Sequence, residues 1–96
     1  MTGSTRSSEN LDVRRRRLLF RSWHRGMREM DLIMGRFADH ALTELADGEL
    51  AEFERLIDVP DWDLLAWITG EIAVPPMFDT ALFQRLRLFH LQDRGL

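Results

Sequence analysis

The sequence predicts an all-α fold, a compact five-helix bundle that forms a single domain over residues 11–96. Apolar residues recur at three- and four-residue spacing in five segments, the period of a helix that buries one face. No segment alternates polar and apolar residues with a period of two for long enough to indicate a strand. The predicted helices are joined by a few residues each, as in antiparallel bundles. Residues 1–10 are small and polar, and we expect a flexible tail there.

The first helix is expected to start at an N-cap, Asn10 or Asp12, and to run to about His24. Its apolar side is predicted to comprise Leu11, Leu18, Leu19, Phe20 and Trp23. Gly26 then interrupts the pattern, as expected where a chain leaves one helix through a left-handed turn and enters another.

The second helix is predicted from Met27 to Ala46 at the latest, because the next residues, Asp47 and Gly48, favour a turn. Its inward residues are predicted to be Met30, Ile33, Met34, Phe37, Ala38, Ala41 and Leu45. Gly35 lies inside this pattern, where glycine costs about 1 kcal/mol relative to alanine. We therefore expect another part of the molecule to pack closely against Gly35.

Three shorter helices complete the prediction. The third spans Glu49 to Ile57 after an Asp47 cap, and the fourth begins at an Asp58 cap with Pro60 in its first turn and closes at Gly70. Pro75-Pro76 predicts an irregular connection. The fifth helix follows an Asp79 cap, runs to about Asp93 and ends at Gly95. Predicted inward residues are Leu50, Phe53, Leu56, Ile57, Leu64, Leu65, Trp67, Ile68, Leu82, Phe83, Leu86 and Phe89.

The composition excludes several classes of function. The chain has no Cys and no Lys, so it has no disulfide framework or thiolate zinc site, and all 13 cationic side chains are Arg. No apolar run approaches the roughly 18 residues of a membrane helix. There is no glycine-rich phosphate loop, no paired-histidine zinc motif and no serine in a nucleophile elbow. We therefore expect neither an enzyme nor a tightly bound cofactor or metal.

Charge is distributed unevenly along the chain. Residues 6–28 hold eight Arg and two acids, a net charge of +6, whereas residues 29–96 carry a net charge of −9. This asymmetry indicates either a surface for nucleic acid or an acidic partner, or pairing of the first helix with the acidic remainder. The run Arg14 to Arg17 could contact phosphates. The acidic remainder would repel a duplex, however, and no recognition helix is apparent, so we expect no nucleic-acid partner.

Between the first two helices lies the heptapeptide Arg25-Gly26-Met27-Arg28-Glu29-Met30-Asp31. Helix capping explains part of it, with Gly26 as N-cap and the Glu29 carboxylate reaching back to the cap N–H. Capping does not explain Arg25 and Arg28, because a cation near a helix N-terminus is mildly unfavourable unless it meets an acidic group.

The heptapeptide resembles the RGxxE signature, in its extended form RGM-[RK]-E-x-D, of the succinate dehydrogenase assembly factor family (bacterial SdhE and mitochondrial assembly factor 2). The resemblance extends over roughly residues 14–94 through Phe37 with His40, the acidic turn at Asp47, the Pro60-Asp61 helix start and the Trp67 helix. It implies that Arg25, Gly26 and Glu29 form the functional signature. The predicted partner-binding surface adds the neighbouring residues Arg28, Asp31, Arg21 and His24.

The resemblance implies an assembly factor that binds the flavoprotein subunit of succinate dehydrogenase, or of the related fumarate reductase, and promotes covalent attachment of FAD held by that partner. The flavin and the partner carry such chemistry, so a helper need only supply geometry and exclude water. A free monomer without membrane insertion is expected, in the bacterial cytoplasm or the mitochondrial matrix. Arg25 is hypothesised to pair with an acidic or carbonyl group of the partner, with Glu29 orienting it or binding the partner's backbone. The alternative is a regulatory binding module, antitoxin-like or binding nucleic acid through the basic first helix.

Overall fold

Five α-helices make up most of residues 11–93, the part of the chain that the computed structural model describes. They are α1 (Val13–Trp23), α2 (Arg28–Ala41), α3 (Asp47–Ile57), α4 (Asp61–Thr69) and α5 (Ala81–Asp93). Two single-turn 3-10 helices, Leu42–Glu44 and Pro76–Phe78, follow α2 and precede α5. No strand occurs in this part, which confirms the predicted all-α class. The predicted tail over residues 1–10 and the predicted stop at Gly95 lie outside the described residues.

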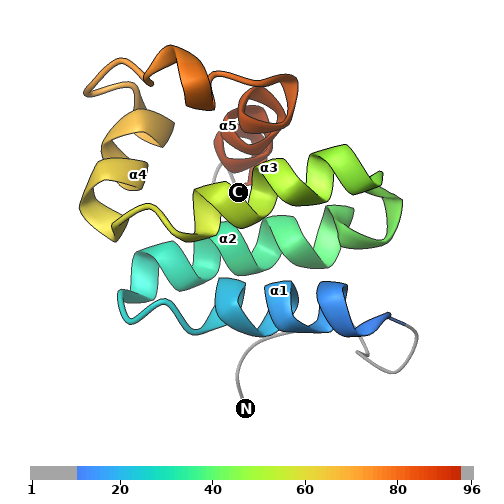
Figure 1. Ribbon diagram of the computed structural model, residues 1–96. Coiled ribbons are helices and arrows are strands. Elements are labelled where there is room, and N and C mark those ends of the chain that lie inside the picture. The colour runs from blue at the N-terminus through green and yellow to red at the C-terminus, as the bar shows by residue number, and fades with distance from the viewer. Residues whose placement is uncertain (1–10, 94–96) are drawn as a thin grey trace.

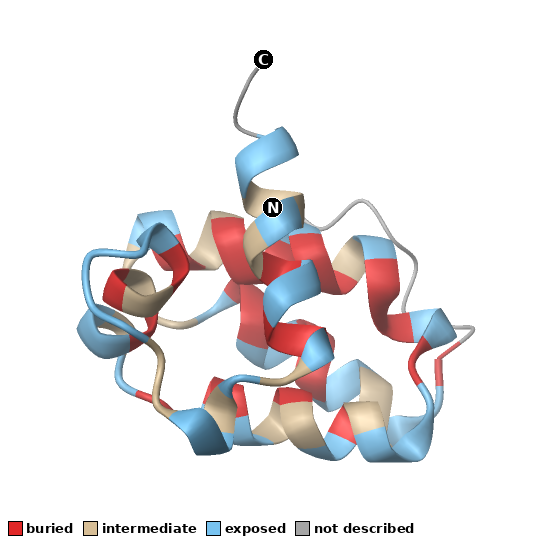
Figure 2. Cartoon of the chain, turned by 90° about the horizontal axis from the view of Figure 1, so that it is seen from above, coloured by how far each residue is buried: buried red, intermediate tan, exposed pale blue. Residues whose placement is uncertain are grey.

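The helices pack around one shared core. Helix α1 packs along α2 and also contacts α3, while α5 contacts α2, α3 and α4 (Figure 1). The residues coloured as buried lie mainly where the helices face one another, and exposed residues lie mainly on the outer faces (Figure 2). The largest fully buried aromatic side chains are Phe37, Phe53 and Phe83. The predicted inward residues of the second helix are all buried, so its periodicity identified the core face correctly.

Trp23 of α1 packs directly against Gly35 of α2. A Cβ atom built on Gly35 would lie 2.2 Å from Cδ2 of the Trp23 indole, closer than any real contact. The indole therefore occupies the space that a side chain at Gly35 would need. The expectation that a neighbour packs closely against Gly35 is confirmed, and the neighbour is Trp23.

Several predicted helix ends are also confirmed. Asp12, one of two candidate caps, is the N-cap of α1, and its Oδ1 accepts a hydrogen bond from the Arg15 N–H at 2.8 Å. Gly70 closes α4 with a φ of 84°, a left-handed conformation that suits glycine. Its N–H donates to the Trp67 carbonyl at 3.2 Å.

Helix α2 ends at Ala41, within the predicted limit of Ala46, and the chain then tightens into the 3-10 turn Leu42–Glu44. Three predicted helix starts are wrong. Asp47 is the first residue of α3, and Ala46 is the N-cap, with its N–H donating to Glu49 at 2.9 Å. Pro60, not Asp58, is the N-cap of α4. Thr80, not Asp79, caps α5, because its Oγ1 accepts from the Phe83 N–H at 3.1 Å.

The remaining corrections concern burial and the Pro75-Pro76 connection. A 3-10 turn begins at Pro76, so this connection is not irregular throughout. Phe20, predicted to face inward, is 63% exposed. Leu65, Trp67 and Phe89 are only partly buried, and Trp67 packs against Phe78 with 5.2 Å between ring centroids.

The helices within residues 11–93 include no candidate for a membrane-spanning segment, because none combines the necessary length with an apolar sequence.

Candidate partner-binding site

The turn between α1 and α2 is built around Gly26. Its φ is 102°, which an L side chain rarely adopts, and a Cβ atom there would meet nothing within 4 Å. Glycine is therefore required by the backbone and not by lack of space. Met27, not Gly26 as predicted, is the N-cap of α2, and its carbonyl accepts from the Asp31 N–H at 2.9 Å.

The guanidinium of Arg25 points into the molecule. Its Nε donates to Asp61 Oδ1 at 2.6 Å, its Nη1 to the Ile57 carbonyl at 2.8 Å and its Nη2 to the Val59 carbonyl at 2.6 Å. The side chain is only 6% exposed. The acidic group that the sequence required for Arg25 is thus Asp61 of the same chain. These acceptors belong to the same chain, and the hypothesis that Arg25 pairs with an acidic or carbonyl group of the partner stays a prediction.

Local backbone structure explains why these acceptors are available. Ile57 is the last residue of α3, and the final carbonyls of a helix lack intrahelical partners. Val59 precedes Pro60, and a residue before proline favours extended backbone. The cation of Arg25 lies at the C-terminus of α3 and the carboxylate of Asp61 in the first turn of α4, which are the favourable ends for those charges.

Asp31 holds the backbone of the same turn. Its Oδ1 accepts a hydrogen bond from the Arg25 N–H at 2.5 Å, so the acid that reaches back over the helix start is Asp31 and not Glu29 as predicted. Arg28 and Glu29 are exposed, and their side chains make no hydrogen bond or ion pair with any residue between 11 and 93. Gly26 is exposed as well. We call the three exposed residues Gly26, Arg28 and Glu29 the turn face.

Arg21 and His24 lie beside the turn, on the edge of a shallow groove of about 330 Å³. Arg21 Nη2 donates to Asp58 Oδ1 at 2.7 Å. The His24 ring stacks on Phe20 with centroids 4.0 Å apart, and its Nδ1 lies 2.7 Å from the Phe20 carbonyl oxygen. The groove is lined by Phe20, Arg21, His24, Arg25, Ile57, Val59, Pro60 and Asp61. The structure thus brings all seven predicted site residues to one region, some exposed and some buried.

A family of known proteins matches this chain. The sequence profile described as "Flavinator of succinate dehydrogenase" matches residues 16–90, which include the whole turn and the segment that binds Arg25. The chain belongs to this flavinator family. The resemblance inferred from the heptapeptide is therefore confirmed.

Individual relatives carry names that agree with the family. The chain is 42% identical over 74 residues to "Succinate dehydrogenase assembly factor 2, mitochondrial" of Scheffersomyces stipitis, covering 77% of this chain and 50% of the relative. The same identity and length hold for the protein of that name from Debaryomyces hansenii, of which 52% is covered. An assembly factor 2-B of Drosophila yakuba is 37% identical over 84 residues, covering 85% of this chain and 54% of the relative. The chain thus spans about half the length of the curated relatives it matches.

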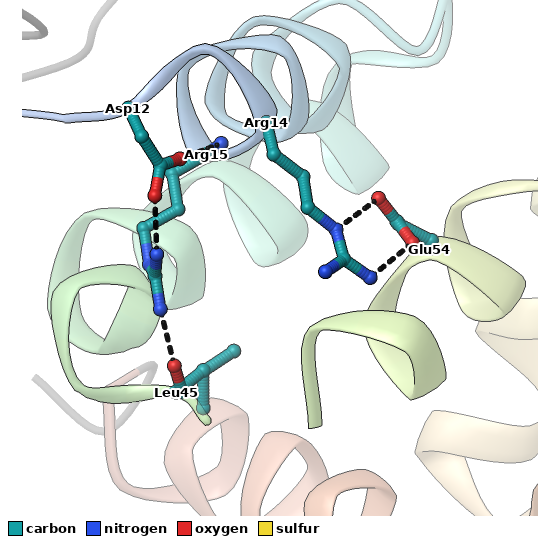
Figure 3. A network of polar contacts seen from close by, with 5 residues as sticks. All are labelled: Asp12, Arg14, Arg15, Leu45 and Glu54. Atoms are coloured by element: carbon teal, nitrogen blue, oxygen red, sulfur yellow. Dashed lines mark hydrogen bonds and ion pairs between the residues drawn. The ribbon is translucent and has the colours of Figure 1, made fainter. Parts of the chain in front are cut away.

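In this flavinator-family chain the basic first helix is largely paired internally. Arg14 forms two 2.9 Å hydrogen bonds with the Glu54 carboxylate of α3 (Figure 3). Arg15 bonds Asp12 and also donates to the Leu42 and Leu45 carbonyls at 2.8 and 2.5 Å. Arg14 and Arg15, half of the Arg14 to Arg17 run, thus pair with other parts of the chain, which was one of the two explanations of the charge asymmetry. These two cations are therefore less available to a phosphate-binding surface.

These contacts shift three titrations. The hydrogen bond from the Arg15 backbone N–H lowers the pKa of Asp12, and Arg15's guanidinium acts in the same direction. The side-chain hydrogen bonds of the Arg14–Glu54 pair lower the pKa of Glu54 and raise the pKa of Arg14. Within residues 11–93 no group of three His, Asp or Glu residues is placed to hold a metal ion.

Sequence reasoning missed Asp61, Ile57 and Val59 as parts of the flavinator signature's surroundings. Ile57 was predicted only as a buried residue at the end of the third helix, and residues 58–61 only as the start of the fourth. One signal was present, since the residue before Pro60 is expected to be extended and to leave its carbonyl free near an acid. Nothing in the sequence indicates that these acceptors meet Arg25, because Arg25 and Asp61 are 36 residues apart.

Proposed function

We propose that this protein binds the flavoprotein subunit of succinate dehydrogenase, or of the related fumarate reductase, and promotes the covalent attachment of FAD to it. Membership of the flavinator family supports the assembly role. The observation that carries the finer proposal is the turn face, where Gly26, Arg28 and Glu29 are exposed and both charged side chains lack a partner among the described residues. Exposed charges without internal partners, beside a glycine that allows close approach, suit recognition of another protein.

In this proposal the protein is not an enzyme. The covalent chemistry belongs to FAD and to the flavoprotein residues that hold it. This chain contributes binding. Glu29 accepts hydrogen bonds from donors of the flavoprotein, Arg28 donates to its acidic or carbonyl groups, and Gly26 leaves room for its backbone. By holding the flavoprotein in a reactive geometry and excluding water, the complex lowers the barrier through proximity and preorganised electrostatics. The protein acts as a monomer, in the cytoplasm of a bacterium or the mitochondrial matrix of a eukaryote.

Removing the charged groups of the turn face tests the proposal. Glu29→Ala and Arg28→Ala are each co-expressed with the flavoprotein subunit, and covalent flavin is measured by its fluorescence in a denaturing gel. We expect at least a tenfold loss of covalent flavin for Glu29→Ala and a smaller loss for Arg28→Ala. Both variants should unfold within about 0.5 kcal/mol of the wild type, because the side chains are exposed and make no hydrogen bond or ion pair within the described residues.

Glu44→Ala is the matched control, since Glu44 is an exposed acid at the opposite end of the α2 segment. It should leave flavin attachment unchanged. Wild-type levels of covalent flavin with a folded Glu29→Ala variant would contradict the proposal.

A further inference from the structure

We infer that Arg25 and Asp61 are positioning residues, which hold the turn face in place for the flavoprotein and do not bind the flavoprotein themselves. This inference rests on the proposed function and divides the signature into two parts. Arg25 belongs to the supporting part, and Gly26, Arg28 and Glu29 belong to the recognising part. Asp61 lies outside the signature in sequence but belongs to the supporting part together with Arg25.

The side chain of Arg25 is already bound on the inside. Its three guanidinium nitrogens each donate to a different acceptor, and the distances range from 2.6 to 2.8 Å. With 6% of the side chain exposed, little of it is available to another protein. Planar donors at fixed angles match two carbonyls and a carboxylate at once, which the single ammonium of lysine cannot do.

The backbone of Arg25 is held as well. Asp31, in the first turn of α2, accepts the Arg25 N–H, while Asp61, in the first turn of α4, accepts from the side chain. The residue directly before Gly26 is therefore fixed from two directions. Because Gly26 leads through Met27 into the first turn of α2, fixing Arg25 also fixes where Arg28 and Glu29 emerge.

Releasing Arg25 to a partner would carry a large penalty. The guanidinium would give up three hydrogen bonds, and two backbone carbonyls would lose their donors. Asp61, of which 18% is exposed, would lose its counter-charge. A positioning role keeps all of these bonds in the complex, whereas a direct contact would require breaking them.

The first arm of the test uses the free protein. Amide hydrogen exchange is compared for wild type, Asp61→Ala and Glu54→Ala. Glu54→Ala is the control, because it also removes an ion pair to α3, but one made by Arg14 in the first turn of α1 and not by the turn that contains Gly26. We expect the amides of residues 26–31 to exchange at least tenfold faster in Asp61→Ala relative to the amides of α5, and no such selective change in Glu54→Ala. Unchanged protection of residues 26–31 in Asp61→Ala would overturn the inference.

The second arm measures affinity for the purified flavoprotein subunit. Arg25→Ala, Asp61→Ala and the double variant form a thermodynamic cycle. We expect each single variant to bind at least tenfold more weakly, and the double variant to bind no more weakly than the weaker single one, since both changes release the same turn. Asp61→Asn keeps an acceptor for Nε and should retain more affinity than Asp61→Ala, whereas Arg25→Lys should not restore binding.

The outcomes separate the inference from the proposed function. Wild-type affinity in Asp61→Ala combined with weak binding in Arg25→Ala, or independent effects that multiply in the double variant, would show that Arg25 or Asp61 contacts the flavoprotein directly. Failure of the wild-type protein itself to bind the flavoprotein would contradict the proposed function, and the exchange experiment on the free protein would still decide whether the pair positions the turn. If Asp61→Ala does not fold, the exchange comparison is made with Asp61→Asn.

Discussion

Arg15, near the start of α1, and Arg25, just after its end, both donate hydrogen bonds to backbone carbonyls that follow another helix or end it. Arg15 donates to the Leu42 and Leu45 carbonyls after α2, and Arg25 donates to the Ile57 and Val59 carbonyls after α3. Each also pairs with an acid, Asp12 or Asp61. A guanidinium combines these contacts because its donors are fixed in a plane. In a chain without lysine, these two arginines therefore act as structural donors.

Gly26 offers a test at the scale of one residue. Gly26→Arg forces a side chain into a φ of 102°, which should cost about 1–2 kcal/mol and lower the melting temperature measured by circular dichroism. It should also abolish flavin attachment, because the new side chain projects from the turn face. Gly70→Arg is the control, since Gly70 also has a positive φ, at 84°, but closes α4 away from the turn. A similar loss of covalent flavin in both variants would mean that destabilisation alone explains the effect.

At this scale the sequence pointed to the correct family but could not orient the side chains of the heptapeptide. Capping was expected to engage Glu29, and Arg25 and Arg28 were expected to need an acidic group. Arg25 turns inward because its side-chain acceptors lie at the end of α3 and the start of α4, and Asp31 does so because it accepts the Arg25 N–H. Arg28 and Glu29 have no such partner among residues 11–93. Distant residues decide this difference, and local sequence does not contain it.

The bodies of the helices were predictable, and their ends were less so. Hydrophobic spacing fixed the buried face of α2 because that face packs against the rest of the core. The N-caps of α3, α4 and α5 were misplaced by one or two residues. Asp47, Asp58 and Asp79 are residues of the type that favours an N-cap, but in each case a neighbouring residue is the cap. Phe20 was wrongly assigned to the core because a wide apolar side does not show where the neighbouring helix stops.

The contact between α1 and α2 yields a prediction at the scale of an element. Gly35→Ala should lower the free energy of unfolding by about 1–3 kcal/mol, because its Cβ would overlap the Trp23 indole. Gly48→Ala should instead raise stability by about 0.4–1 kcal/mol, since Gly48 lies in α3 and a Cβ there meets nothing within 4 Å. Urea denaturation of both variants measures the difference. Equal stabilities would contradict the close packing of Trp23 on Gly35.

At the scale of the whole molecule, several arginines of the basic N-terminal part form ion pairs with acids of the remaining chain. The basic α1 is joined to the acidic remainder through Arg14–Glu54 and Arg21–Asp58, and the turn that follows it through Arg25–Asp61. The exposed pairs each contribute little, typically about 0–1 kcal/mol, while the buried pair is costly to break on one side. Internal pairing occupies several cations of this surface, and the expectation of no nucleic-acid partner stays a prediction.

Acid should weaken these contacts. The pKa values of Asp12 and Glu54 are lowered in the folded protein, so their contribution to stability is present above the pKa values of the unfolded chain and is lost as pH falls through the lower, folded values. We expect the urea midpoint of the wild type to fall as pH decreases below about 4. Glu54→Gln should show a smaller decrease over this range. A pH dependence identical to that of the wild type would contradict a role for the Arg14–Glu54 pair.

The bonds of Arg25 also determine how much of the chain is needed to present the signature. A synthetic peptide covering α1, the turn and α2 would contain every letter of RGxxE, yet it would lack Ile57, Val59 and Asp61, which hold the arginine. During synthesis on the ribosome, likewise, the arrangement can form only after residue 61 has left the exit tunnel. The motif is short in sequence, but its arrangement depends on contacts with residues more than 30 positions away in the chain.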